Sequence, residues 1–108
     1  MTWLKIGQQH FALPEKLKPR EEPYRVRVDA SDVALALNEP RGTSFQNILH
    51  GRVLAVEKMG SAYCDVTLSI DGQPIIARVT NKAQSELSLA PDLPVFVMIK
   101  SVAVEGAR

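Results

Sequence analysis

The sequence predicts a mainly β protein: a small, closed or partly closed barrel with Greek-key connections and one short helix. Three observations favour this class. Short segments of alternating apolar and polar residues recur along the chain, turn signals separate them at close spacing, and one segment has a helix-start pattern. The 108 residues suit one domain, whose surface stays substantially exposed unless a partner chain covers part of it.

The N-terminal part of the chain predicts strands interrupted by a loop. Residues 3–13 read as two short strands around a Gly7-Gln8 turn, and 14–23 contain three prolines that predict a loop. Tyr24, Val26 and Val28 alternate with charged residues, which predicts a half-buried strand over 24–29. Further on, Ser31 and Asp32 are expected to cap a single turn before 33–37, and 38–42 has turn chemistry.

The middle of the chain predicts a long strand followed by a tight hairpin. Residues 47–58 form the expected long strand, and Gly60 and Ser61 turn the chain. The segment 65–71 alternates, with Val66, Leu68 and Ile70 on one face. Asp71-Gly72 is a strong hairpin signal, and 73–80 is the expected return strand.

The C-terminal part predicts the helix and a last strand. Asn81 and Gln84 form a plausible capping box for a helix over 81–89 that ends before Pro91. The last strand is expected over 95–104, and its first half is apolar on both faces. Two explanations remain open for that half: a second subunit covers one face, or the strand lies inside a tight barrel.

Composition and motifs exclude several classes of protein. A net charge of +1 argues against binding nucleic acid through a strongly basic face. Cys64 is the single cysteine, so neither an intrachain disulfide nor a thiolate metal site is possible. No apolar run is long enough for a membrane span and no signal-peptide pattern is present, so we expect a cytoplasmic chain. Catalytic motifs are absent, and His10 and His50 stand alone, which favours a surface or packing role for them over catalysis.

Neutral polar side chains gather in three clusters at the edges of the predicted elements. Each cluster taken alone is also what caps and strand ends look like. Together they offer hydroxyl, amide and backbone N–H donors with little charge, which suits a small tetrahedral oxyanion. Donors alone favour fully deprotonated molybdate, tungstate or sulfate over phosphate, which keeps a proton near neutral pH. The clusters are Thr43, Ser44, Phe45, Gln46 and Asn47; Thr80, Asn81 and Lys82; and Lys100 with Ser101.

These residues carry a resemblance to a known family. The stretch 44-SFQN-47, followed by 51-GRV-53, resembles the opening Ser-Ala-Arg-Asn and Gly-x-Val motif of Mop (molbindin) domains in the TOBE superfamily. The Asp71-Gly72 hairpin, 77-ARVT-80, 85-SELSL-89 and 99-IKSVAV-104 are similar to it as well. Upstream, 25-RVRVDASDVALAL-37 and 41-RGTS-44 resemble the C-terminal regulatory region of ModC, the ATPase subunit of molybdate ABC transporters.

The resemblance implies an OB-like β-barrel (TOBE/Mop) with one short helix and N-terminal strands, paired into a homodimer with oxyanion sites at the interface. Residues 1–42 would complete a regulatory domain and 43–108 would form the oxyanion-binding module. The implied ligand is molybdate or tungstate, without a tightly bound cofactor or metal site. The implied partners are the nucleotide-binding domain and the membrane permease of the transporter, at the inner face of the membrane. By position, Ser44 and Thr80 supply hydroxyls, Phe45 and Gln46 supply backbone N–H groups, and Lys100 with Ser101 come from a neighbouring subunit.

Two departures from the family pattern bear on function. The motif arginine is Gln46 here, and the second hydroxyl after Thr80 falls at Ala83, which together weaken binding by about 1–3 kcal/mol if both groups touch the anion. A dimerisation domain without ligand therefore stays open. A free-standing oxyanion storage protein is a further alternative, against which the residues before the motif count, because free molbindins resemble only the part after it. The ligand domain of a repressor would need a DNA-binding helix pair, and the sequence has no such pattern.

Overall fold

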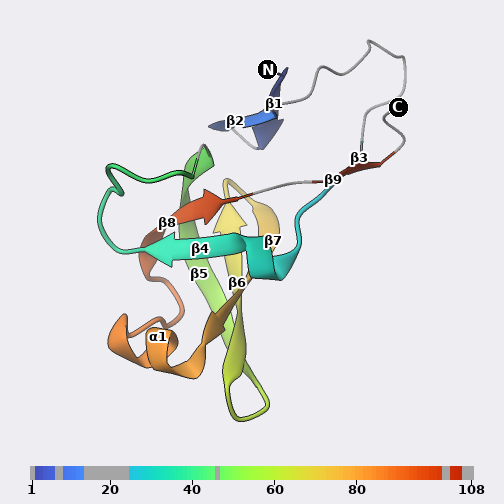
Figure 1. Cartoon of the computed structure of the whole chain (residues 1–108). Coiled ribbons are helices and arrows are strands. Elements are labelled where there is room, and N and C mark those ends of the chain that lie inside the picture. Colours follow the sequence, from blue (N-terminus) through green and yellow to red (C-terminus); the bar gives the residue numbers. More distant parts are fainter. Residues whose placement is uncertain (1, 7–8, 14–24, 46, 101–102, 106–108) are drawn as a thin grey trace.

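The computed structural model describes residues 2–6, 9–13, 25–45, 47–100 and 103–105 (Figure 1). Its main body is one antiparallel sheet of five strands in the order β4-β8-β5-β6-β7. Contacts of β7 with β4 and with the 3-10 turn η1 show that the sheet curls into a half-barrel. The predicted barrel-like, mainly β class is confirmed. The sheet strands are β4 (Val33–Ala36), β5 (Asn47–Met59), β6 (Tyr63–Ile70), β7 (Gln73–Thr80) and β8 (Pro94–Ile99).

The long strand β5 connects the two halves of the sheet. Its first part pairs with β8, from Asn47 opposite Ile99 to Arg52 opposite Pro94, and its second part pairs with β6, starting from Arg52 opposite Ser69. The β5–β6 register shifts between Val53 and Ala55, and a bulge of this kind bends a strand and increases its twist. This bend lets one strand serve both halves of a curved sheet.

The predicted hairpin is confirmed, and it supplies much of the core. Asp71 and Gly72 have φ angles of 50° and 90°, which are the left-handed conformations that a tight two-residue turn requires. The inward face of β6 is fully buried, as the alternation predicted. Cys64 is buried there too, and burial raises the pKa of its thiol. The buried core contains Val33, Leu49, Val53, Cys64, Val66, Leu68, Ile70, Ala77, Leu89, Val95, Val97 and Ile99.

Two small antiparallel ribbons accompany the half-barrel. The first pairs β1 (Thr2–Ile6) with β2 (Gln9–Leu13), as predicted, although the expected Gly7-Gln8 turn and the 14–23 loop lie outside the described residues. The second pairs β3 (Arg25–Arg27) with β9 (Ala103–Glu105). β3 is shorter than the strand predicted over 24–29, because Val28 and Asp29 already lead into η1 (Ala30–Asp32).

The prediction of one continuous last strand was wrong. Residues 94–99 form β8, an inner strand of the sheet between β4 and β5, and 103–105 form β9 in the separate ribbon with β3. Between them, the Lys100 N–H donates to the Asp32 carbonyl at 2.8 Å, which draws the chain toward η1. On β8, Val95, Val97 and Ile99 face the core, whereas Phe96 and Met98 are half-buried on the other face.

Both predicted cap positions also need correction. The N-cap of α1 (Asn81–Glu86) is Thr80 rather than Asn81: Thr80 is extended, and its hydroxyl accepts a hydrogen bond from the Ala83 N–H at 3.0 Å. Gln84 therefore makes no capping box and donates to the Leu89 carbonyl instead. Asp29, which makes no side-chain cap bond, is the N-cap of η1, and Ser31 and Asp32 lie inside that turn.

Candidate functional site

Two of the three predicted polar clusters meet at one end of the half-barrel. Asn47 is the first residue of β5 and lies opposite Ile99, the last residue of β8, so Lys100 follows directly beside the start of β5. Asn47 is only 7% exposed and is the single buried polar residue among those described. Thr43 is half-buried, and Ser44 is exposed. Antiparallel pairing therefore places the backbone of Lys100 beside the start of β5, into which the hydroxyl-bearing residues Thr43 and Ser44 lead.

Backbone contacts fix this end of the sheet. The Phe45 N–H donates to the Thr43 hydroxyl oxygen at 3.2 Å, which leaves the hydroxyl proton of Thr43 able to donate outward. The main chain of Lys100 is held by its bond to Asp32, and none of the ion pairs found among the described residues involves its ammonium group. Within the described part of the chain, its positive charge is therefore not balanced by an ion pair. Gln46 and Ser101 lie outside the described residues.

The remaining cluster lies at the opposite end of the sheet, beside the last residue of β5. Thr80 is paired with Tyr63, and Tyr63 is paired with Met59, the last residue of β5. β5 has 13 residues, so at about 3.3 Å per residue its two ends are roughly 40 Å apart along the strand. Figure 1 shows α1, which follows Thr80, far from the first residues of β5. One chain alone does not assemble all three clusters. In one chain Lys100, rather than Thr80, lies beside the segment with Ser44, which differs from the grouping that the resemblance implied.

Each residue of this distant cluster already has a local role. The Thr80 hydroxyl caps α1 but keeps its own proton as a donor. The Asn81 N–H donates to the Ala62 carbonyl at 2.8 Å, and its buried side-chain oxygen Oδ1 has no partner in the described part of the protein. Lys82 forms an exposed ion pair with Glu86 at 3.7 Å, one helical turn away. This ion pair on the exposed surface of the helix is a sufficient structural role for Lys82.

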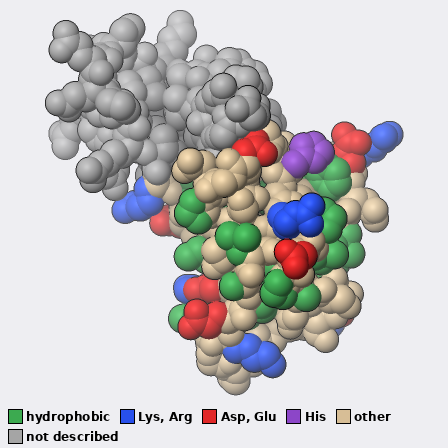
Figure 2. Space-filling model, turned by 180° about the vertical axis from the view of Figure 1, so that it is seen from behind, with side chains coloured by type: hydrophobic (Ala, Val, Ile, Leu, Met, Phe, Trp, Pro, Cys, Tyr) green, Lys and Arg blue, Asp and Glu red, His purple; other side chains and the backbone are tan. Residues whose placement is uncertain are grey.

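The described residues contain no metal-binding constellation. No group of three His, Cys, Asp or Glu side chains lies close enough together to hold a metal ion within these residues. No described helix is long and apolar enough to cross a membrane. Figure 2 shows basic and acidic side chains interspersed on the face seen from behind, rather than gathered into one basic patch.

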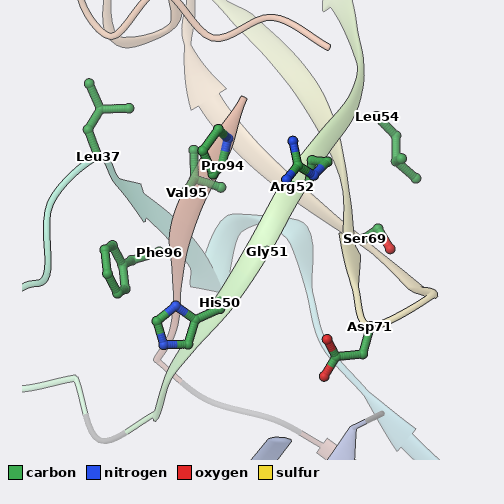
Figure 3. Close-up of a pocket in the computed structure, with 10 residues that line it drawn as sticks. All are labelled: Leu37, His50, Gly51, Arg52, Leu54, Ser69, Asp71, Pro94, Val95 and Phe96. Atoms are coloured by element: carbon green, nitrogen blue, oxygen red, sulfur yellow. The ribbon is translucent and has the colours of Figure 1, made fainter. Parts of the chain in front are cut away.

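The structure also has a shallow hollow that the sequence did not predict. It has a volume of about 660 Å³ and lies over β5 around Gly51, with the His50 ring packed at 4.9 Å from the Phe96 ring (Figure 3). Gln9, from the N-terminal hairpin, bonds to the backbone of His50 at the edge of this hollow. The alternation of His50, Arg52 and Leu54 was a usable sequence signal for this outward face, but it did not identify Gln9.

Comparison with known proteins adds an independent line of evidence. The family model described as "TOBE domain" matches residues 43–105, which is more than half of the chain. The chain is 34% identical over 105 residues to the molybdenum import ATP-binding protein ModC of Escherichia coli (strain K12), covering 96% of this chain and 29% of that protein. The same protein of Salmonella choleraesuis (strain SC-B67) is 34% identical over 104 residues, again covering 96% and 29%. The chain thus spans less than a third of the length of these relatives.

A solved structure also matches the fold. It is that of the cytoplasmic molybdate-binding protein ModG with molybdate bound, and the TM-score is 0.66 at 32% sequence identity. The match covers 73% of this chain and 58% of the ModG chain. The family and the fold are therefore supported by separate comparisons.

Proposed function

Because the chain belongs to the TOBE domain family and is homologous to the C-terminal region of ModC, we propose that it is a regulatory domain that binds molybdate or tungstate for an ABC importer. The observation that carries the proposal is the meeting of the first cluster with Lys100. The segment that carries the hydroxyls of Thr43 and Ser44 leads into β5 where β8 ends, just before Lys100, and the Lys100 ammonium group has no ion-pair partner among the described residues. The molybdate-bound ModG structure shares this fold and supports the choice of ligand.

The chemistry of this end of the sheet suits a doubly charged oxyanion. Thr43 and Ser44 donate through their hydroxyls, and Lys100 supplies one positive charge without the desolvation of several buried ions. The Phe45 N–H becomes a further donor when it leaves the Thr43 oxygen, to which it is joined by a 3.2 Å bond. The backbone N–H of Gln46, the side chain of Asn47 and Ser101 complete the proposed set on this side.

The second half of the site comes from another copy of the chain. Thr80, Asn81 and Lys82 lie too far from Ser44 in one chain, so a homodimer paired through the barrel would bring the end of β7 of one copy to the start of β5 of the other. Bound oxyanion would then favour one arrangement of the paired domains. In the cytoplasm, that arrangement would hold the attached nucleotide-binding domains apart and stop import by the membrane permease when molybdate is plentiful.

Calorimetric titration of the chain with molybdate and tungstate tests the proposal, with sulfate and phosphate as competing anions. We expect molybdate or tungstate to bind and phosphate to remain silent. Lys100→Ala and Ser44→Ala are expected to weaken binding, the former by about 10- to 100-fold because a charged hydrogen bond is lost. Arg52→Ala is the control, since Arg52 is an exposed cationic residue midway along β5, away from both ends that carry the proposed site.

Two other outcomes would identify different functions. The chain could bind molybdate tightly and yet, when it is joined to a nucleotide-binding domain, leave the rate of ATP hydrolysis unchanged by molybdate. That result would indicate a storage protein. Silence at millimolar molybdate from a folded dimer would indicate a dimerisation domain without ligand. Gln46, Ala83 and the engaged N–H of Phe45 are the features that favour this last outcome.

A further inference from the structure

The first part of β5 has an edge that no neighbouring strand covers in the described part of the sheet. Pairing with β6 begins only at Arg52 opposite Ser69, because β6 ends at Ile70 and the chain turns at Asp71. In an antiparallel strand a residue directs its N–H and C=O to the same side. At His50 both groups therefore face the place where a continued β6 would lie. Such an edge leaves backbone donors and acceptors in need of partners.

A single side chain takes the place of the missing strand. The His50 N–H donates to Gln9 Oε1 at 2.6 Å, and Gln9 Nε2 donates to the His50 carbonyl at 2.8 Å. The same Nε2 lies 3.3 Å from Oδ2 of Asp71, in the turn that ends β6. The primary amide of Gln9 thus reproduces the two-bond pattern by which one strand residue pairs with another.

This contact joins two segments that lie far apart in the sequence. Gln9 is the first residue of β2, and 41 positions separate it from His50. β2 contacts β5, and Figure 1 shows the N-terminal hairpin beside the end of the half-barrel at which β5 begins. The three bonds of Gln9 involve no hydrogen bond of the five-stranded sheet, so they can break while the sheet stays intact.

We propose that Gln9 is a latch that docks the β1–β2 hairpin on the half-barrel by completing the open edge of β5. When the latch opens, the hairpin is released as a unit, and the N–H and carbonyl of His50, beside the shallow hollow, lose their partner. His50 and Asp71, the two residues that the latch holds, both line that hollow, on either side of β5 (Figure 3). The proposal does not depend on oxyanion binding.

Amide hydrogen exchange at His50 tests the latch, because the bond to Gln9 protects that N–H. In Gln9→Ala we expect exchange at His50 to accelerate by about 10- to 100-fold, which corresponds to the loss of two neutral hydrogen bonds. The Val53 N–H, bonded to the Leu93 carbonyl at 2.9 Å, is the internal control and should be unaffected. Backbone 15N relaxation should show β2 moving independently of the sheet.

Gln9→Glu separates hydrogen bonding from packing. It keeps the size of the side chain and its acceptor, but at neutral pH the carboxylate cannot donate to the His50 carbonyl and it repels Asp71. We expect it to open the latch as Gln9→Ala does. Gln73→Glu, at an exposed glutamine of β7, is the matched control. Unchanged exchange at His50 in Gln9→Glu, with β2 still tumbling with the sheet, would overturn the proposal. Fast exchange at His50 in the unmodified chain would overturn it too.

Discussion

Gly51 lies where the side chain of Val97 and the backbone of Ser69 leave too little room for a Cβ atom. A Cβ at this position would be 2.7 Å from Cγ2 of Val97 and 3.2 Å from the Ser69 carbonyl oxygen. We expect Gly51→Ala to lower the free energy of unfolding by about 1–3 kcal/mol, because the buried core must shift to admit the methyl group. Urea unfolding measures the loss. In a Val97→Ala background, where Cγ2 is gone, the loss should shrink, and an equal loss in both backgrounds would contradict this steric explanation.

Thr80 is the residue at which strand β7 becomes helix α1. Its hydroxyl satisfies the Ala83 N–H, which has no partner inside the helix. We expect Thr80→Ala to lower the free energy of unfolding by about 1 kcal/mol, as measured in urea, because the cap is lost. Thr80→Ser keeps the hydroxyl and should retain most of the stability. If the serine variant lost as much as the alanine variant, the methyl group rather than the cap would be responsible.

At the scale of elements, local signals were sufficient for the strands whose partners follow them directly in sequence. β5, β6 and β7 were predicted within two residues at each end, because alternation and the Asp71-Gly72 turn are local properties. The break between β8 and β9 was missed because it depends on distant residues: β9 pairs with β3, and Lys100 bonds to Asp32. The helix start was displaced by one residue because Thr80 and Asn81 both favour caps and only the extended backbone of Thr80 decides between them.

The β6–β7 pair carries a cross-strand ion pair with a predictable pH dependence. Arg78 donates to both carboxylate oxygens of Asp65, at 2.8 and 3.0 Å, and these hydrogen bonds lower the pKa of Asp65. Because the pKa of Asp65 is lower in the folded than in the unfolded chain, its carboxylate stabilises the fold at pH values above the unfolded-state pKa. This stabilisation is lost as the pH falls through the folded-state pKa. Asp65→Asn should therefore be less stable than the unmodified chain at pH 7.

Urea unfolding between neutral pH and strong acid measures this effect. The difference between Asp65→Asn and the unmodified chain should close as the pH falls below about 4, the usual value for an aspartate, and vanish below the folded pKa. Glu39→Gln is the control, because Glu39 is exposed and forms no ion pair with any described residue. A difference that stayed constant into acid would mean that Asp65 acts through its shape rather than its charge.

At the scale of the whole molecule, the sequence identified candidate residues but not their arrangement. The residue types and the family motif pointed to Ser44, Thr80 and Lys100. The register of β5 with β8 places Lys100 beside the start of β5, and its register with β6 places Thr80 at the other end. No local sequence pattern encodes either register. Gln9 escaped prediction for a related reason, because its partner is backbone 41 positions away.

This arrangement makes subunit complementation the sharpest prediction for the proposed site. Lys100→Ala and Thr80→Ala alter opposite ends of the sheet. Each variant, purified by itself, should therefore bind the oxyanion more weakly. In an equimolar mixture that exchanges subunits, half of the dimers are mixed and each has one intact site, so calorimetry should recover about a quarter of the sites. If mixing restores no binding, both residues act within one chain or Thr80 acts only as a cap.

The β3–β9 ribbon has a mechanical consequence. Arg25 lies opposite Glu105, and Arg27 lies opposite Ala103, so both ends of the half-barrel leave it through one short antiparallel ribbon. A force that separates residues 25 and 105 meets the rungs of this ribbon one after another, as when a zipper opens, rather than all together in shear. The ribbon would yield first, and the tension would reach Asp32 and Lys100 before any buried strand. A pull on residues 25 and 105 would thus reach Lys100, beside the proposed oxyanion site, before it reaches the buried core.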